Sequence, residues 1–133
     1  SDISCEAWRA ELLRRQTDER KEASTNPYDA DALGNKKHKP FLRVEGQTAI
    51  ALVGLGAVTG LDTDPVHPMT NSSDPSVLHW IDTIWIEDQL GDIICMRRLS
   101  PEEPSPAILS CPIPSGVQQI TAFEHCNSHG TFV

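Results

Sequence analysis

The amino-acid sequence predicts an all-β protein: an antiparallel sandwich of about seven strands with an N-terminal helical extension. Ten prolines and eight glycines interrupt an apolar content of 38%, a composition typical of turn-rich β proteins and not of helical bundles. From residue 41 onward, the apolar residues fall into short runs of strand length separated by turn residues. The 133 residues suffice for one domain with a single core, which we place at residues 36–133, after a helix and linker at residues 1–35.

The N-terminal helix is predicted over residues 5–23, which are rich in Glu, Arg, Leu and Ala. Cys5, Trp8 and Leu12 fall on one stripe of that helix, while charged residues occupy the rest of its surface. The polar residues 24–35 are expected to form a linker, or an arm that lies on the domain. Nothing in this region indicates catalysis.

Six apolar runs in the rest of the chain are predicted as strands: residues 41–44, 48–55, 77–86, 93–96, 107–111 and 117–123. The segments between them are rich in Gly, Asp, Pro and Ser, and the longest is residues 56–76. Six or seven short antiparallel strands favour a sandwich. Trp80 and Trp85 lie on opposite faces of the third run, so at least one of them is expected in the core.

The charge of the chain excludes one class of partner. A formal net charge of -8 argues against nucleic-acid binding, which needs a concentrated positive surface. The cluster Lys36, Lys37 and Lys39 is too small to follow a phosphate backbone. No stretch approaches the roughly 20 apolar residues that a membrane span requires.

The cysteines bear on both chemistry and compartment. Cys5, Cys95, Cys111 and Cys126 do not form paired CxxC motifs, which argues against a four-cysteine zinc ribbon. Cys95 and Cys111 are predicted to face each other across a hairpin that turns at residues 100–106. An exported protein would bridge them, whereas a reducing cytosol would keep them as buried thiols. The chain shows no secretory leader; we expect a cytoplasmic location, with a periplasmic or otherwise exported mature chain as the alternative.

The densest chemical signal is the segment Cys126-Asn127-Ser128-His129-Gly130. Its thiolate and imidazole are separated by two residues and can bind one metal from a single tight turn. Backbone N–H groups in that turn could hydrogen-bond the sulfur. Four of the five histidines, which are His38, His67, His79, His125 and His129, sit in loops or at strand starts, where they can converge on a rigid sandwich.

Four segments together resemble a known family. They are Lys37-His38-Lys39-Pro40, His67-Pro68-Met69, Leu78-His79-Trp80-Ile81 and Cys126-Asn127-Ser128-His129-Gly130. Their order is similar to that of EKHVP, HPM, HYI and CNLHG in superoxide reductases and in the iron domain of desulfoferrodoxins. The resemblance runs from about residue 36 to the C-terminus and implies an immunoglobulin-like β-sandwich.

The resemblance also implies a ligand set for one mononuclear non-haem iron: equatorial His38, His67, His79 and His129, with Cys126 on the axis. Four neutral imidazoles hold Fe(II) without neutralising it, and one thiolate donates electron density along the axis. His125 matches no ligand. The implied activity is one-electron reduction of superoxide to hydrogen peroxide, with Lys37 attracting the anion.

Electrons would come from a separate donor such as a rubredoxin-like protein, because residues 1–35 contain only Cys5. Three departures from the family are visible: Lys36 replaces the usual glutamate, residues 70–77 contain an insertion, and Thr131-Phe132 stand where an aromatic residue commonly follows the HG pair by one position. Met69 is expected to pack beside the ligand loop and not to bind copper.

Two other functions remain open on the same sandwich. One is a non-catalytic iron module for electron transfer, and the other is a structural zinc domain that uses four of the five candidate ligands. No nucleic acid or membrane partner is expected, and a homo-oligomer is left open.

Overall fold

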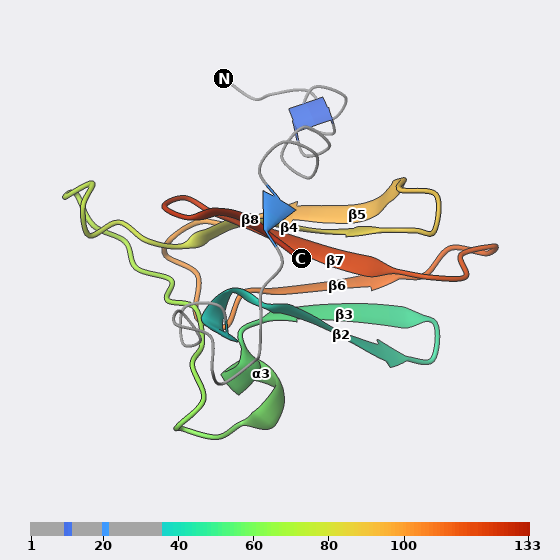
Figure 1. Ribbon diagram of the computed structural model, residues 1–133, viewed down its shortest axis with the longest axis horizontal. Helices are drawn as coiled ribbons and strands as arrows, with labels where there is room; N and C mark the ends of the chain where they lie inside the picture. The colour runs from blue at the N-terminus through green and yellow to red at the C-terminus, as the bar shows by residue number, and fades with distance from the viewer. Residues whose placement is uncertain (1–9, 12–19, 22–35) are drawn as a thin grey trace.

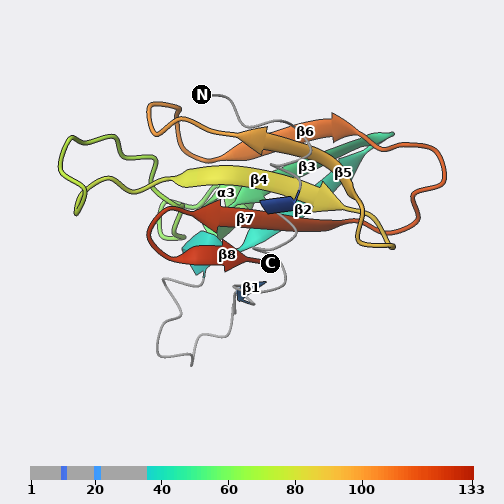
Figure 2. The ribbon, with the colours of Figure 1, turned by 90° about the horizontal axis from the view of Figure 1, so that it is seen from above.

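A computed structural model describes residues 10–11, 20–21 and 36–133. Its strands are β1 (Arg20–Lys21), β2 (Pro40–Glu45), β3 (Thr48–Val53), β4 (Ile81–Glu87), β5 (Ile93–Arg98), β6 (Ile108–Pro112), β7 (Thr121–Cys126) and β8 (Gly130–Phe132), and a short helix, α3 (Leu55–Thr59), follows β3. They form a five-stranded sheet in the order β1-β8-β7-β4-β5 and a three-stranded sheet in the order β2-β3-β6. Figure 1 shows β2 and β3 in the layer below β4, β5 and β7, and Figure 2 shows the larger sheet strand by strand.

The predicted sandwich is confirmed. From β2 onward, the chain passes from one sheet to the other after β3, after β5 and after β6, which is the Greek-key arrangement of an immunoglobulin-like sandwich. All pairings between neighbouring strands are antiparallel except that of β1 with β8. Among the described residues, no helix is long and apolar enough to cross a membrane.

The six predicted strands correspond to β2 through β7, with shifted ends. The third run begins as a strand at Ile81 rather than at residue 77, and the sixth runs to Cys126 rather than to residue 123. The second run stops at Val53, because Gly54 has φ 101° and the chain then enters α3. Strand β8 was not predicted; its three residues are too short to show an alternating pattern.

The prediction of a helix over residues 5–23 is wrong at its C-terminal end. Ala10 and Glu11 are helical, but Arg20–Lys21 forms a two-residue strand that pairs in parallel with β8, Arg20 opposite Thr131. The exposed edge of β8 offers backbone groups that a strand can satisfy, and this pairing overrides a weak helical propensity. The rest of that helix and the linker lie outside the described residues, and the division at residue 36 stays a prediction.

The core lies between the two sheets. Ile84 and Ile86 from β4, Ala51 from β3 and Leu109 from β6 belong to one buried cluster. A smaller cluster is built around Trp85, which stacks on Phe123 with ring centroids 5.3 Å apart. The expectation that one of the two tryptophans is in the core is therefore confirmed.

The cysteine prediction is half right. Cys95 and Cys111 form a disulfide with their Cα atoms 6.6 Å apart, within the range that a bridge allows. They do not face each other across a hairpin, however, because β5 and β6 lie at the ends of different sheets. The chain between them crosses from sheet to sheet, so the bridge joins the two layers at one edge of the sandwich.

Candidate metal centre

The ends of several strands bring the candidate ligands together. Pro40 pairs with Val53, and Cys126 pairs with both Ile81 and Gly130, so the start of β2, the end of β3, the start of β4 and the end of β7 lie at one end of their sheets. His38 precedes β2, His79 precedes β4, and His129 lies in the turn between β7 and β8. His67 lies in the segment that follows α3. This is loop-borne chemistry on a rigid frame.

The four predicted histidine rings form a closed ring of contacts. The ring centroids of His38 and His67 are 4.6 Å apart, and those of His67 and His79 are 4.4 Å apart. His129 completes the circuit, 5.1 Å from His79 and 5.1 Å from His38. Neighbouring rings are tilted or edge-on to one another, with interplanar angles from 56° to 77°.

Two of these rings present buried nitrogens without a protein partner. Nε2 of His67 and Nε2 of His79 are buried and make no hydrogen bond within the described structure. Nδ1 of His67 lies 2.8 Å from the carbonyl oxygen of Pro68, and this contact assigns the proton to Nδ1 and a lone pair to Nε2. Because a buried unsatisfied nitrogen is costly, the arrangement fits a metal as the missing partner.

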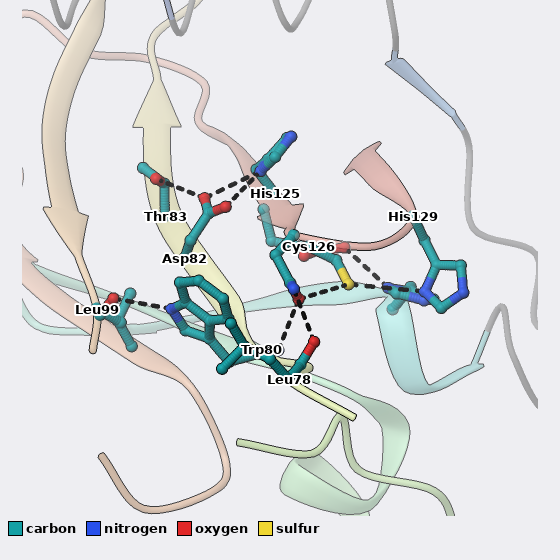
Figure 3. Close-up of polar contacts among 11 residues, drawn as sticks. Leu78, Trp80, Asp82, Thr83, Leu99, His125, Cys126 and His129 are labelled. Atoms are coloured by element: carbon teal, nitrogen blue, oxygen red, sulfur yellow. Dashed lines mark hydrogen bonds and ion pairs between the residues drawn. The ribbon is translucent and has the colours of Figure 1, made fainter. Parts of the chain in front are cut away.

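Cys126 completes a compact donor group. One ligand atom from each of His38, His67, Cys126 and His129 lies within 4.8 Å of the others. Metal–nitrogen and metal–sulfur bonds of about 2.0–2.3 Å place any two ligands of one ion within about 4.6 Å of each other, so little contraction would be needed. Sγ of Cys126 is 3.6 Å from Nδ1 of His129 (Figure 3). His79 lies outside this tight group and joins through its contacts with the rings of His67 and His129.

The electrostatics of the group favour neutral imidazoles. Burial, followed by the charge of His67, lowers the pKa of His38 to about 2. Burial also lowers the pKa of His67 to about 3 and shifts that of His79 downward. Neutral imidazole is the metal-binding form, so the folded chain holds these rings ready for a metal at neutral pH.

The thiol of Cys126 is protonated in the metal-free protein. Burial raises its pKa to about 11, and backbone N–H groups of Ser128 and His129 partly offset that rise. The expectation that the turn after Cys126 hydrogen-bonds the sulfur is therefore confirmed. A metal that binds here must displace this proton, and the two N–H groups would then stabilise the thiolate.

Glu124 is a buried acid beside the group that the sequence analysis did not single out. Its Oε1 lies 3.3 Å from Nδ1 of His38, and its side chain is fully buried. Burial raises the pKa of Glu124 well above its usual value, and the charge of Asp82 adds to the rise. Glu124 points to the same side of β7 as Cys126, which follows it by two residues. An acidic residue at an inward-facing position of an otherwise apolar strand is the sequence signal that could have identified it.

Asn127 ties two ligand segments together. Its Oδ1 accepts a hydrogen bond from the backbone N–H of Trp80, and its Nδ2 donates to the carbonyl oxygen of Leu78, both at 2.8 Å. Its own N–H donates to the carbonyl oxygen of Trp80 at 3.2 Å. The residues on both sides of His79 are thus fixed to the residue that follows Cys126. Positions 47 and 49 residues apart give no local signal of such a contact.

Two glycines let the His67 segment approach the sheet. A Cβ on Gly54 would lie 3.0 Å from the Cα of Val66 and 3.2 Å from the backbone nitrogen of His67. The N–H of Gly54 donates to the carbonyl oxygen of Lys39 at 2.8 Å, next to His38. A Cβ on Gly56 would lie 2.8 Å from a side-chain methyl carbon of Val66. The close packing of backbone behind two rings depends on these missing side chains.

His125 lies apart from the ring group. Its Nδ1 is 2.8 Å and 2.9 Å from the two carboxylate oxygens of Asp82 (Figure 3), and Thr83 donates its hydroxyl to the same carboxylate. As neighbours in an extended strand, His125 and Cys126 point to opposite faces of the sheet. The geometry agrees with the resemblance, which assigned His125 no ligand role.

The lysines near the site occupy different positions. The charge of Lys37 contributes to the lowered pKa values of His38, His67 and His79, so its ammonium group acts on three of the four rings. Nζ of Lys39 instead lies 3.3 Å from the carbonyl oxygen of Val133. Lys36 and Lys37 are both half-buried, in a helical turn with His38. Met69 packs against the core, as expected.

The fold is shared with solved superoxide reductases. The structure of the superoxide reductase from Treponema pallidum superposes with a TM-score of 0.52 at 24% sequence identity, over 74% of this chain and 64% of that chain. The superoxide reductase from Giardia intestinalis gives a TM-score of 0.48 at 17% identity, over 73% of this chain and 93% of that chain. This chain therefore spans 64% of the length of the Treponema protein. No family model and no curated protein matches the sequence.

Proposed function

We propose that this chain is a superoxide reductase that holds one iron ion through His38, His67, His79, His129 and Cys126. The observation that carries the proposal is the quartet of imidazole rings beside a buried thiol, with two of the rings presenting buried, unpartnered Nε2 atoms. Bound iron would supply the single electron that turns superoxide, with two protons, into hydrogen peroxide. The shared fold supports the proposal.

The donor set favours iron over structural zinc. A structural zinc site is a closed tetrahedral shell of four ligands, usually with several thiolates. Here four donors form the compact group and one of them is sulfur, while the buried Nε2 of His79 has no partner in the described structure. A tetrahedral ion held by those four donors would leave the His79 nitrogen unsatisfied. Nitrogen-rich sites with a single thiolate suit a redox metal whose electron density the sulfur can raise.

The chain itself directs an anion to the site. Lys37 provides a positive charge beside three of the rings, while the whole chain carries a net charge of -8 and repels superoxide at long range. His129 is exposed, whereas the other members of the compact group are buried, so the site is reached from the His129 side. A separate electron donor such as a rubredoxin-like protein would restore the reduced state.

The absorption spectrum of the oxidised protein tests the metal and its sulfur ligand together. A thiolate bound to Fe(III) gives a visible charge-transfer band, which Cys126→Ser should abolish. His125→Ala, next in sequence but directed to the opposite face, is the matched control and should keep the band. If Cys126→Ser keeps full iron content and an unchanged band, the sulfur assignment is wrong.

The rate of the ferrous protein with pulsed superoxide tests Lys37. Lys37→Ala should slow the second-order reaction and flatten its dependence on ionic strength, because the steering field is screened over roughly 10 Å at 0.1 M salt. Lys39→Ala removes the same charge from a residue that binds the Val133 carbonyl and should have a smaller effect. Equal rates for Lys37→Ala and the parent protein at every salt concentration would remove Lys37 from the mechanism. A ferrous protein that does not react with superoxide at all would instead be an electron-transfer module.

The disulfide favours the exported alternative for location. Bridges such as Cys95–Cys111 persist in oxidising compartments and are rare in the cytosol. We therefore propose an oxidising compartment in place of the expected cytoplasm. Thiol labelling of the protein isolated from its source under acid quench tests this, because a cytosolic protein would label at both residues.

A further inference from the structure

We propose that the loop closed by the Cys95–Cys111 disulfide, acting through Ser105, positions the His67 and His79 segments for metal binding before the metal arrives. The inference rests on the proposed metal site and adds positioning residues to it. The disulfide and the loop belong to no segment that carries a ligand. The loop runs from Cys95 in β5 to Cys111 in β6, whereas the proposed ligands come from the segments before β2 and β4, from the end of β7 and from the turn that follows it.

The segment that carries two of the rings lacks support of its own. Residues 60–80 belong to neither sheet, and the backbone pairing described within them is the isolated bridge between Thr70 and His79. This segment is long, and no helix or sheet strand within it fixes the path of its backbone. The positions of His67 and His79 must therefore come from contacts with neighbouring parts of the molecule.

The disulfide-closed loop supplies three such contacts. The hydroxyl of Ser105 donates to the carbonyl oxygen of His67 at 2.8 Å. The indole Nε1 of Trp80, next to His79, donates to the carbonyl oxygen of Leu99 at 3.0 Å (Figure 3). A third bond runs between the two loops: Asn71 Nδ2 donates to Glu102 Oε1 at 3.2 Å. The three loop residues that make these hydrogen bonds, Leu99, Glu102 and Ser105, all lie between Cys95 and Cys111.

The loop is itself held in shape. Arg97 donates to the carbonyl oxygen of Ile108 at 2.9 Å and pairs with Glu103. Glu103 also accepts a hydrogen bond from the backbone N–H of Ser100 at 2.8 Å. The disulfide closes this arrangement with a sequence separation of 16 residues and so limits the conformations in which Ser105 can leave His67.

Preorganisation gives these contacts their effect on metal binding. Gathering four imidazoles and a thiol without a metal leaves Nε2 of His67 and Nε2 of His79 buried without a partner, which is costly. If the segments were free to separate, part of the binding free energy of the metal would be spent on bringing them back. A braced loop removes that cost in advance.

The test measures the affinity of the metal-free protein for Co²⁺, followed by the thiolate-to-cobalt absorption and by calorimetry, without superoxide. Ser105→Ala should bind Co²⁺ about fivefold more weakly, the factor that corresponds to one hydrogen bond of about 1 kcal/mol. Ser110→Ala, an exposed serine of β6 inside the same loop, is the matched control and should bind as the parent protein does. Thermal unfolding of each metal-free variant is recorded in parallel.

A double-mutant cycle tests the disulfide. Cys95→Ser with Cys111→Ser should weaken Co²⁺ binding, and adding Ser105→Ala to that variant should weaken it less than fivefold, because the loop is then already loosened. If the variant without the bridge does not fold, Glu102→Ala with the bridge intact replaces it, because it removes the acceptor of the Asn71 hydrogen bond, and it should show the same direction of effect. Ser105→Ala with unchanged affinity, or full additivity in the cycle, would overturn the inference. A parent protein that binds no Co²⁺ would overturn the proposed function as well, which separates the two failures.

Discussion

Two histidine–carboxylate pairs lie on opposite faces of β7, and they differ in depth. The inner pair joins His38 to Glu124 at 3.3 Å, with side chains 4% and 0% exposed, whereas the outer pair joins His125 to Asp82 at 2.8 Å, with side chains 13% and 20% exposed. Each pair joins an imidazole to a carboxyl group, and Glu124 and His125 are neighbours in sequence. The inner pair borders the ring group, and the outer pair does not. Because successive residues of a strand point to opposite faces, neighbouring positions of β7 thus serve a candidate metal site on one face and a half-buried histidine–carboxylate pair on the other.

The largest expected difference between the two pairs is in metal content. His38→Ala removes a ring from the closed circuit and should reduce bound iron from one ion per chain to a small fraction. His125→Ala should leave the iron content unchanged, because its ring points to the opposite face. Atomic absorption on protein purified without added metal measures both. A large loss of iron in His125→Ala would show that the outer histidine supports the site.

Stability should separate the pairs next. Glu124→Ala opens space in the core and leaves Nδ1 of His38 buried without a partner, at a cost of about 3 kcal/mol in the free energy of unfolding. Asp82→Ala removes a partly exposed ion pair, which should cost about 1 kcal/mol. Denaturant unfolding of the metal-free proteins gives both values. Equal losses would mean that burial does not distinguish these pairs.

Acid should destabilise the metal-free protein through its buried histidines, His38 and His67. The pKa values of His38 and His67 fall from 6.5 to about 2 and about 3 on folding. Below pH 6.5 these histidines bind protons in the unfolded chain but not in the folded chain. Their contribution to the free energy of unfolding is therefore fully present above pH 6.5 and falls progressively toward pH 3. His67→Gln should reduce the slope of stability against pH. A slope that this variant leaves unchanged would place the acid sensitivity elsewhere in the molecule.

Glu124 should produce a smaller effect of opposite sign. Its pKa is raised on folding, so its contribution to stability is complete below pH 4.5 and is lost as pH rises toward the folded value. Glu124→Gln keeps the shape and removes this titration, and its stability relative to the parent protein should improve as the pH rises above 4.5. Asp82→Asn should reproduce part of the gain, because the charge of Asp82 is the second cause of the raised pKa. A parent-to-Gln difference that is constant with pH would mean that Glu124 ionises normally in the folded protein.

The sequence predicts the layers of the fold better than their ends. Apolar runs of strand length correctly locate β2 through β7, since burial between sheets imposes that pattern. The sequence does not reveal β1, because its two residues are charged and pair with the edge strand β8, and they therefore show no apolar pattern. The geometry of the Cys95–Cys111 bridge was also missed: symmetric spacing about a turn cannot distinguish a hairpin from a crossover between sheets.

The candidate site divides in the same way. The rings and the thiol that meet in the structure are those that the sequence motifs single out, because each stands in a short, recognisable segment. The contacts behind them are long-range: Ser105 reaches His67 across 38 residues, and Glu124 reaches His38 across 86. No local period or spacing encodes such contacts, and they depend on which strands become neighbours.

Substitutions of Gly54 and Gly56 should disrupt the site, although neither residue has a side chain that could bind a metal. A methyl group on Gly54 would press on the backbone of Val66 and His67. One on Gly56 would press first on the carbonyl oxygen of Asp64, and then on the side chain of Val66. In a saturation mutagenesis screen selected for metal retention, we expect every substitution at Gly54 to be depleted about as strongly as substitutions of the ligands themselves. Exposed Gly46, where an added Cβ meets nothing within 4 Å, should tolerate Asn or Asp, which accept its positive φ. The positions that tolerate no substitution would then include the backbone packed behind the rings. A design that transfers this site to another sandwich would have to include those glycines.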